Sequence, residues 1–163
     1  MATGTIILPL EAGVPHSTNP PALALTNSRS WHLLFDDTTP ETHYWQFAMP
    51  ANYASGLTAK VLYSMASATA DDVEFEVAIM AVSDGDSADM ATDSFDTANA
   101  GHATVPGTAG YPDVITVTCT NADSVAAGDF VCVSLARDAD DGTNDDATGD
   151  AEVHAFWLEY TTS

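Results

Sequence analysis

The sequence has almost no basic residues. Only Arg29, Lys60 and Arg137 oppose 24 aspartates and glutamates, so the 163-residue chain has a formal net charge of -21. A surface of that sign repels phosphate groups, which disfavours nucleic acid and anionic membranes as partners. A chain this acidic is highly soluble, and it suits a salty medium whose ions screen the repulsion between its own carboxylates.

The sequence also lacks a long apolar run, and we expect no secretory leader. No segment approaches the roughly 20 apolar residues that span a bilayer. The first ten residues, MATGTIILPL, contain no basic residue, and their apolar run is too short for a signal peptide. We therefore expect the protein to fold in the cytoplasm in which it is made.

Cysteine is scarce as well. Cys119 and Cys132 both fall within strand-like segments, and neither Cys-x-x-Cys nor a Cys/His zinc spacing is present. We expect two buried free thiols, and a disulfide between them is the alternative.

The usual signatures of catalysis are absent from the sequence. It has no Gly-x-Ser-x-Gly elbow, no Walker loop and no Rossmann glycine pattern. The histidines are scattered, with no pair at helical ligand spacing: His16, His32, His43, His102 and His154. We therefore predict a protein that is not an enzyme, with no catalytic residue and no cofactor. A three-histidine metal enzyme of cupin type is an alternative, and it predicts bound metal.

One loop is rich in aspartate and runs from Asp138 to Asp150. Calcium binds several hard oxygens from a flexible loop, and an EF-hand has glycine at position six and glutamate at position twelve. Counted from Asp138, the glycine comes one position early and the glutamate is missing. We expect a solvated acidic loop. If it binds structural calcium, the candidate ligands are Asp138, Asp140 and Asp141.

What the sequence does contain is a repeated alternation of apolar and polar residues, which is the period of a β-strand. The predicted strands are 31–35, 43–49, 57–66, 73–82, 102–105, 113–120, 129–136 and 153–161. These strands and their long loops predict an all-β fold, a single-domain antiparallel β-sandwich of jelly-roll type. The residues predicted to be buried are Val61, Val77, Ile79, Val117, Val133 and Leu158.

Residues 1–28 differ from the rest because they are proline-rich and nearly free of charge. We predict an extended N-terminal arm over residues 1–28, followed by the jelly-roll domain over residues 29–163. The apolar residues Ile6, Ile7, Leu8 and Leu10 are the predicted partner-binding part of the arm. A first strand with a meandering lead-in is the alternative interpretation.

Large aromatic residues are the remaining candidates for a binding surface. They are Trp31, Tyr44, Trp45, Tyr53, Trp157 and Tyr160. On one face of a sandwich they would form a platform on which sugars stack. In β-sandwiches, however, such residues mostly fill the core or a subunit interface, and that is the expectation here.

Arg137 stands at the end of an apolar strand, directly before the acidic loop. We expect it to form a structural salt bridge with Asp138 or with another residue of that loop.

Several turns and strand ends between Trp45 and Tyr160 resemble a jelly-roll domain of tailed-bacteriophage structural proteins. The matching segments are Trp45-Gln-Phe47 with Pro50, Gly56-Leu57, Val61 to Ser64, Gly128-Asp129, Leu135 to Asp138, Asp140 to Thr143, Gly149 to Glu152 and Glu159-Tyr160. In that group the domain serves as a capsid decoration (cement) protein or as a module of tail and fibre proteins.

The resemblance implies a virion structural protein that decorates the outer surface of a phage capsid by bridging neighbouring capsomers. Its expected partners are further copies of itself, most simply in a homotrimer, and the major capsid protein. It would be made in the host cytoplasm and end on the capsid exterior. The alternative function is a carbohydrate-binding jelly-roll module of a phage tail or fibre protein, which predicts exposed aromatic residues in a groove.

Overall fold

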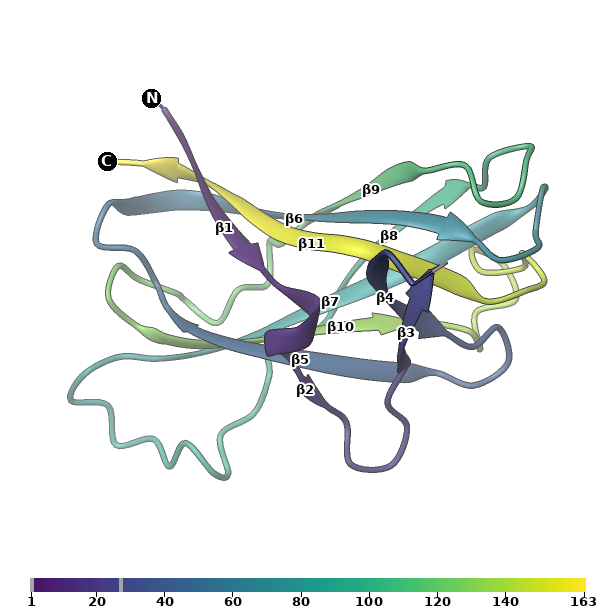
Figure 1. The fold of residues 1–163 in the computed structure, drawn as a ribbon. Helices are drawn as coiled ribbons and strands as arrows, with labels where there is room; N and C mark the ends of the chain where they lie inside the picture. The colour runs from purple at the N-terminus through teal and green to yellow at the C-terminus, as the bar shows by residue number, and fades with distance from the viewer. Residues whose placement is uncertain (1, 27) are drawn as a thin grey trace.

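The computed structural model describes residues 2–26 and 28–163 as a β-sandwich of two antiparallel sheets (Figure 1). Its elements are β1 (Thr3–Leu8), the 3₁₀ turn η1 (Leu10–Ala12), β2 (Val14–Pro15), β3 (Ala22–Thr26), β4 (Ser30–Phe35), β5 (Glu41–Ala48), β6 (Tyr53–Met65), β7 (Asp72–Val82), β8 (Asn99–Thr104), β9 (Asp113–Thr118), β10 (Phe130–Arg137) and β11 (Ala151–Thr162). No helix in the described ranges has the length and apolar character to cross a membrane.

The two sheets have the crossed connections of a jelly roll. In the first sheet the strand order is β3-β4-β11-β6-β9, and β1 also pairs with β11. In the second sheet the order is β2-β5-β10-β7-β8. The predicted fold class is therefore confirmed.

The eight predicted strands correspond to β4 through β11, and their ends agree to within four residues. Alternation explains this agreement, because side chains of a strand point to opposite faces in turn. In β6, for example, Leu57, Ala59 and Val61 are buried, whereas the intervening Thr58 and Lys60 are partly exposed.

The core lies between the two sheets, and all six residues predicted to be buried there are fully buried. Aromatic side chains cross the interface: the rings of Phe35 and Phe75 meet edge-on at 5.7 Å, and Trp45 packs on Phe156 at 5.0 Å. Cys119 and Cys132 are buried free thiols, as predicted. Burial raises the pKa of the Cys119 thiol to about 11.

The N-terminal segment corrects one prediction, because it belongs to the sandwich and does not form a separate arm. β1 pairs with β11 from Thr3↔Thr161 to Leu8↔Phe156, so the two termini lie at the same end of the molecule (Figure 1). β2 likewise pairs with β5, and β3 pairs with β4. The boundary between residues 28 and 29 is therefore wrong as a domain boundary, and the alternative of a first strand with a lead-in describes the segment better.

The physical reason for this correction is burial of apolar side chains. Leu8 and Leu10 belong to the core, and the indole nitrogen of Trp45 donates a hydrogen bond of 2.8 Å to the carbonyl of Pro9. Ile6 is partly buried, and Ile7 alone among the four predicted arm residues is largely exposed, at 67%.

Candidate functional site

A pocket opens where two strands share one edge of β11. β4 pairs with Ala151–Val153 of this edge, and β1 pairs with the part from Phe156 to Thr161. The two residues between them, His154 and Ala155, are paired by neither strand on this side. The pairing of β11 with β6 is also irregular here, because it skips His154, and such a bulge re-aims the side chain.

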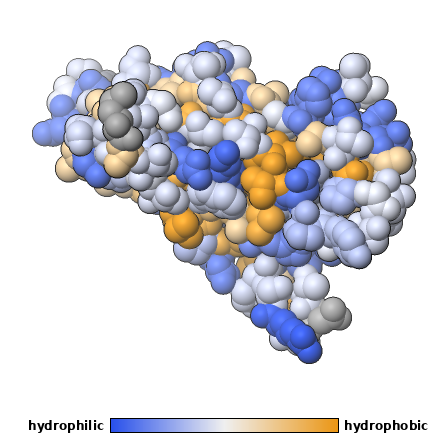
Figure 2. Space-filling view, turned by 90° about the horizontal axis from the view of Figure 1, so that it is seen from above, coloured by the Kyte–Doolittle hydropathy of each residue, from blue (hydrophilic) through white to orange (hydrophobic). Residues whose placement is uncertain are grey.

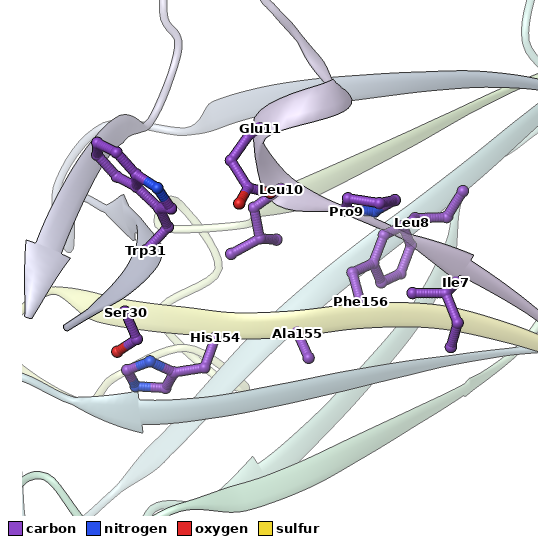
Figure 3. A pocket seen from close by; sticks show the side chains of 10 residues that line it. All are labelled: Ile7, Leu8, Pro9, Leu10, Glu11, Ser30, Trp31, His154, Ala155 and Phe156. Carbon is purple, nitrogen blue, oxygen red and sulfur yellow. The ribbon is translucent and has the colours of Figure 1, made fainter.

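The pocket has a volume of about 300 Å³, with an apolar floor and a partly polar rim. Figure 3 shows Trp31 on one side, Leu8, Pro9 and Phe156 on the other, and Leu10 and Glu11 between them. The full lining is Ile7, Leu8, Pro9, Leu10, Glu11, Ser30, Trp31, His154, Ala155 and Phe156. The floor is built by Leu8, Leu10 and Phe156, which are buried.

Trp31 is the prominent exposed group of the pocket, with 41% of its surface accessible. It lies near the start of β4, before the part of that strand that pairs with β11. Its neighbour across the strand pair is Leu25 of β3. Figure 2 shows orange patches on this otherwise pale and blue side of the molecule. The exposed large apolar residues of the first sheet are Ile7, Leu23, Leu25, Trp31 and Val114.

The polar wall of the pocket is held by a network on the outer face of the first sheet. The Nε2 atom of His154 lies 2.8 Å from the Ser64 hydroxyl, which donates a 3.0 Å hydrogen bond to Glu152. Glu152 also faces His32, whose ring lies 5.8 Å from that of His154. Burial lowers the pKa of His154, the carboxylate of Glu152 opposes this effect, and His32 adds to it.

This network positions His154 and does not activate a nucleophile. The Ser64 hydroxyl has one proton, and it donates this proton in its hydrogen bond to the carboxylate of Glu152. In the tautomer with its proton on Nε2, His154 donates to Ser64, which is the reverse of the direction in which a histidine activates serine. Ser64 is also buried, so no substrate reaches its oxygen.

The other predicted aromatic residues do not join Trp31 in one platform. Trp45 and Tyr160 are buried in the core, and Tyr53 packs against it. Tyr44 of β5, in the second sheet, stacks on Phe95 of the loop between β7 and β8, with ring centroids 5.7 Å apart. The Trp157 indole donates to Glu159 and lies outside the pocket. Most of the set is therefore structural, as expected, and Trp31 is the exception.

Arg137 is completely buried and forms the central ion pair of the acidic loop. Its Nε and Nη2 atoms contact the carboxylate of Asp145 at 2.9 Å and 2.7 Å. Its remaining donors bond the carbonyls of Gly149 and Ala147, both at 2.9 Å. The partner is thus in the acidic loop, as expected, but it is Asp145 and not Asp138.

The acidic residues that lie together in the structure differ from the calcium ligands suggested by the sequence, which were Asp138, Asp140 and Asp141. Asp138 and Asp141 come together with Glu74 of β7, whereas Asp140 is exposed and outside the group. A second group joins Asp36, Asp37 and Asp150. Glu74 precedes the loop by a long stretch of sequence, and only the pairing of β7 with β10 brings it there.

Some of the pocket residues were candidates from the sequence, although not as parts of one pocket, and the others were not identified. Trp31 was a candidate sugar-stacking residue, and Ile7, Leu8 and Leu10 were expected to bind a partner. Glu11, Ser30 and His154 carried no signal, because three segments far apart in the sequence form the pocket.

Comparison with known proteins supports the fold. No family model and no curated protein matches the chain. The solved structure of a xylan-binding module, CBM15, aligns over 99% of both chains with a TM-score of 0.54 and 11% identity. CBM35 from Cellvibrio japonicus Abf62 aligns over 99% of both chains with a TM-score of 0.51 and 8% identity. At these identities the likeness shows a shared jelly-roll fold, whose neighbours are carbohydrate-binding modules.

Proposed function

We propose that the protein is a carbohydrate-binding module of jelly-roll type that binds a glycan at the Trp31 pocket. The observation that carries this proposal is an exposed indole beside an apolar floor, with Glu11, Ser30 and His154 at the rim. Its support from comparison is that solved carbohydrate-binding modules align along the entire chain. The alignment with carbohydrate-binding modules agrees better with the alternative function stated above, a carbohydrate-binding jelly-roll module, than with capsid decoration.

The chemistry of the pocket suits a sugar. A pyranose has an apolar face of C–H groups that stacks on an aromatic ring, and hydroxyls around its edge that need hydrogen-bond partners. Trp31 supplies the ring, and Glu11, Ser30 and His154 supply acceptors and donors. The volume of about 300 Å³ is at the lower end for small-molecule sites, so a short stretch of a glycan fills it.

The charge of the molecule narrows the class of glycan. A formal charge of -21 repels sulfated and uronic-acid polysaccharides, as it repels phosphate. We therefore expect neutral glycans, and xylan is the first to test because CBM15 is a xylan-binding module.

The proposed role is binding without hydrolysis. Glycoside hydrolases place two carboxyl groups on opposite sides of the scissile bond. Among the described residues that line the pocket, Glu11 is the one carboxylate. A single carboxylate supplies a hydrogen-bond acceptor but not an acid–base pair.

The direct test is a binding screen on neutral polysaccharides, followed by calorimetry on the best ligand. Trp31→Ala should weaken binding at least about tenfold, because truncating an aromatic anchor removes a dominant contact. Tyr111→Ala is the matched control, since Tyr111 is exposed at 62% and lies between β8 and β9, away from the pocket. Equal losses in the two variants, or no binding by any neutral glycan, would refute the proposal.

Capsid decoration remains a second proposal, based on the resemblance of the turns and strand ends. The observation that favours it is the exposed apolar set Ile7, Leu23 and Leu25, which could be covered by a partner. It predicts a homotrimer that binds a major capsid protein. Light scattering and co-sedimentation with expanded capsids test these two expectations, and a monomer that stays in the supernatant would contradict them.

A further inference from the structure

The outer face of the first sheet brings two histidines and a glutamate together on β4 and β11. Glu152 and His154 are alternate residues of β11, so both side chains project on the same face, whereas the residue between them is buried. β4 pairs antiparallel with this part of β11, and its register, Val153↔Leu33, places His32 opposite His154. Three side chains from distant parts of the sequence therefore become neighbours.

The carboxylate of Glu152 faces both imidazole rings. Its Oε1 atom is 3.8 Å from Nε2 of His32, and its Oε2 atom is 3.9 Å from Nε2 of His154. The centroids of the two rings are 5.8 Å apart. The separations from the carboxylate are too long for hydrogen bonds. They are close to those of metal ligands, because two atoms that each bind one tetrahedral zinc ion at about 2.0–2.1 Å lie roughly 3.3 Å apart.

Each histidine is held by a hydroxyl group at one of its ring nitrogens. Nδ1 of His32 lies 2.7 Å from the Thr26 hydroxyl, and Nε2 of His154 lies 2.8 Å from the Ser64 hydroxyl. The other nitrogen of each ring has no hydrogen-bond partner among the described residues. In metal sites a histidine binds the ion through one nitrogen while a hydrogen bond at the other fixes the tautomer and the ring orientation. The two hydroxyl groups are placed for that second role.

His32 is the unusual member of the group because it is only 5% exposed. Its free Nε2 atom faces a carboxylate beyond hydrogen-bond distance, and a buried polar atom without a partner is costly. The side chains of Glu152 and His154 are 22% and 24% exposed, so water reaches the group from their side. The arrangement is thus one buried and two accessible ligand groups with an open position.

We propose that His32, Glu152 and His154 bind one zinc ion. Two imidazoles and a carboxylate form a zinc ligand set in which water takes the fourth position, whereas calcium and magnesium favour oxygen ligands alone. The ion would join β4 to β11 beside the Trp31 pocket, whose lining includes His154. A bound zinc ion here would contradict the expectation of no cofactor, and its ligands would differ from the three histidines of a cupin site.

The test is a zinc titration of the full chain after chelator treatment, in 0.15 M salt with excess magnesium to suppress loose binding to the acidic surface. We expect one saturable zinc ion per chain and a higher thermal midpoint when it is bound. His154→Gln and Glu152→Gln should each weaken binding by roughly tenfold or more, because each removes a ligand. Both side chains are partly exposed, so the two variants should fold. The titration contains no glycan, and its result is therefore independent of the proposed function.

A matched control and a second measurement make the result specific. His102→Gln removes a histidine that also lies beside a glutamate, Glu74 at 3.6 Å, but in the second sheet, and it should leave the affinity within about twofold. Cobalt(II) in place of zinc should give the visible spectrum of a tetrahedral site in the wild type and in His102→Gln, but not in His154→Gln. The proposal fails if zinc does not saturate at one ion per chain, if calcium or magnesium displaces it, or if His102→Gln weakens binding as much as His154→Gln does.

Discussion

At the scale of single residues, Arg137 is the side chain that holds the acidic loop to the end of β10. It is fully buried, and it ties Asp145 and the carbonyls of Ala147 and Gly149 to the end of β10. Gly149 has φ at +120°, and a side chain there would collide with the Ser67 hydroxyl, so this part of the loop has little freedom to rearrange. The acidic loop is thus held from within, although its surface is solvated.

We predict that Arg137→Ala lowers the free energy of unfolding by about 3–5 kcal/mol, because it leaves the Asp145 carboxylate buried without its partner. Urea denaturation measures this loss. The double variant Arg137→Met with Asp145→Leu should recover much of it, since apolar side chains then replace both members of the buried ion pair. A loss below about 1 kcal/mol in the single variant would show that the ion pair is not structural.

His43 is a second residue with a measurable consequence. It is buried beside Trp45, and neither ring nitrogen has a hydrogen-bond partner among the described residues. Burial lowers its pKa from the ordinary value of 6.5, and the nearby Leu10 carbonyl opposes this only in part. Below pH 6.5 the unfolded state therefore binds a proton that the folded state does not, so stability falls as the pH falls.

We predict that His43→Leu flattens the dependence of the unfolding free energy on pH between about 7.5 and 5. The comparison with wild type isolates this residue, because the carboxylates with raised pKa values and His154 are present in both proteins. Identical pH profiles for the two proteins would contradict the assignment.

At the scale of elements, β4 through β11 could be predicted as strands, whereas β1, β2 and β3 could not. β6, β7 and β11 show several cycles of alternation, which only a strand with one buried face produces. β1 is followed by Pro9 and its apolar residues Ile6, Ile7 and Leu8 are consecutive, and β2 has only two residues, so neither strand shows a clear period. β1 is placed by its pairing with the open edge of β11. Because this pairing joins the two ends of the chain, no local pattern in the sequence predicts it.

The segment before residue 9 should therefore be needed for stability. We predict that Leu8→Ala costs about 2–5 kcal/mol of unfolding free energy, because it opens a cavity in the core. Ile7→Ala is the control, with a change within about 0.5 kcal/mol, since Ile7 is exposed on the neighbouring position of the same strand. Deleting residues 2–8 should destabilise the domain further, and a deletion variant as stable as wild type would show that β1 is dispensable.

At the scale of the whole molecule, the net charge shapes both stability and choice of ligand. With a formal charge of -21, carboxylates across the surface repel one another, and salt shortens the range of that repulsion from about 30 Å at 0.01 M to about 3 Å at 1 M. We predict that the midpoint of urea unfolding rises steadily with sodium chloride over this range. A midpoint independent of salt would mean that surface repulsion is already neutralised.

The candidate site also belongs to this scale, which explains why the sequence revealed so little of it. The pocket exists because β1 and β4 share one edge of β11, and Glu11, Ser30 and His154 meet only there. Trp31 could be named in advance as an aromatic residue, but its exposure could not, since the other two tryptophans are buried or half-buried. The fold class could be predicted from the local alternation of apolar and polar residues. The site could not, because it depends on which strands lie side by side in the sheet.

The most direct test of the Trp31 pocket uses the three indole N–H signals in an NMR titration with a neutral glycan. The indole of Trp45 is bonded to Pro9 and that of Trp157 to Glu159, whereas that of Trp31 has no partner among the described residues. We expect saturable binding in which the Trp31 signal shifts furthest and the Trp157 signal stays in place. Saturable binding that leaves the Trp31 signal unmoved would contradict it.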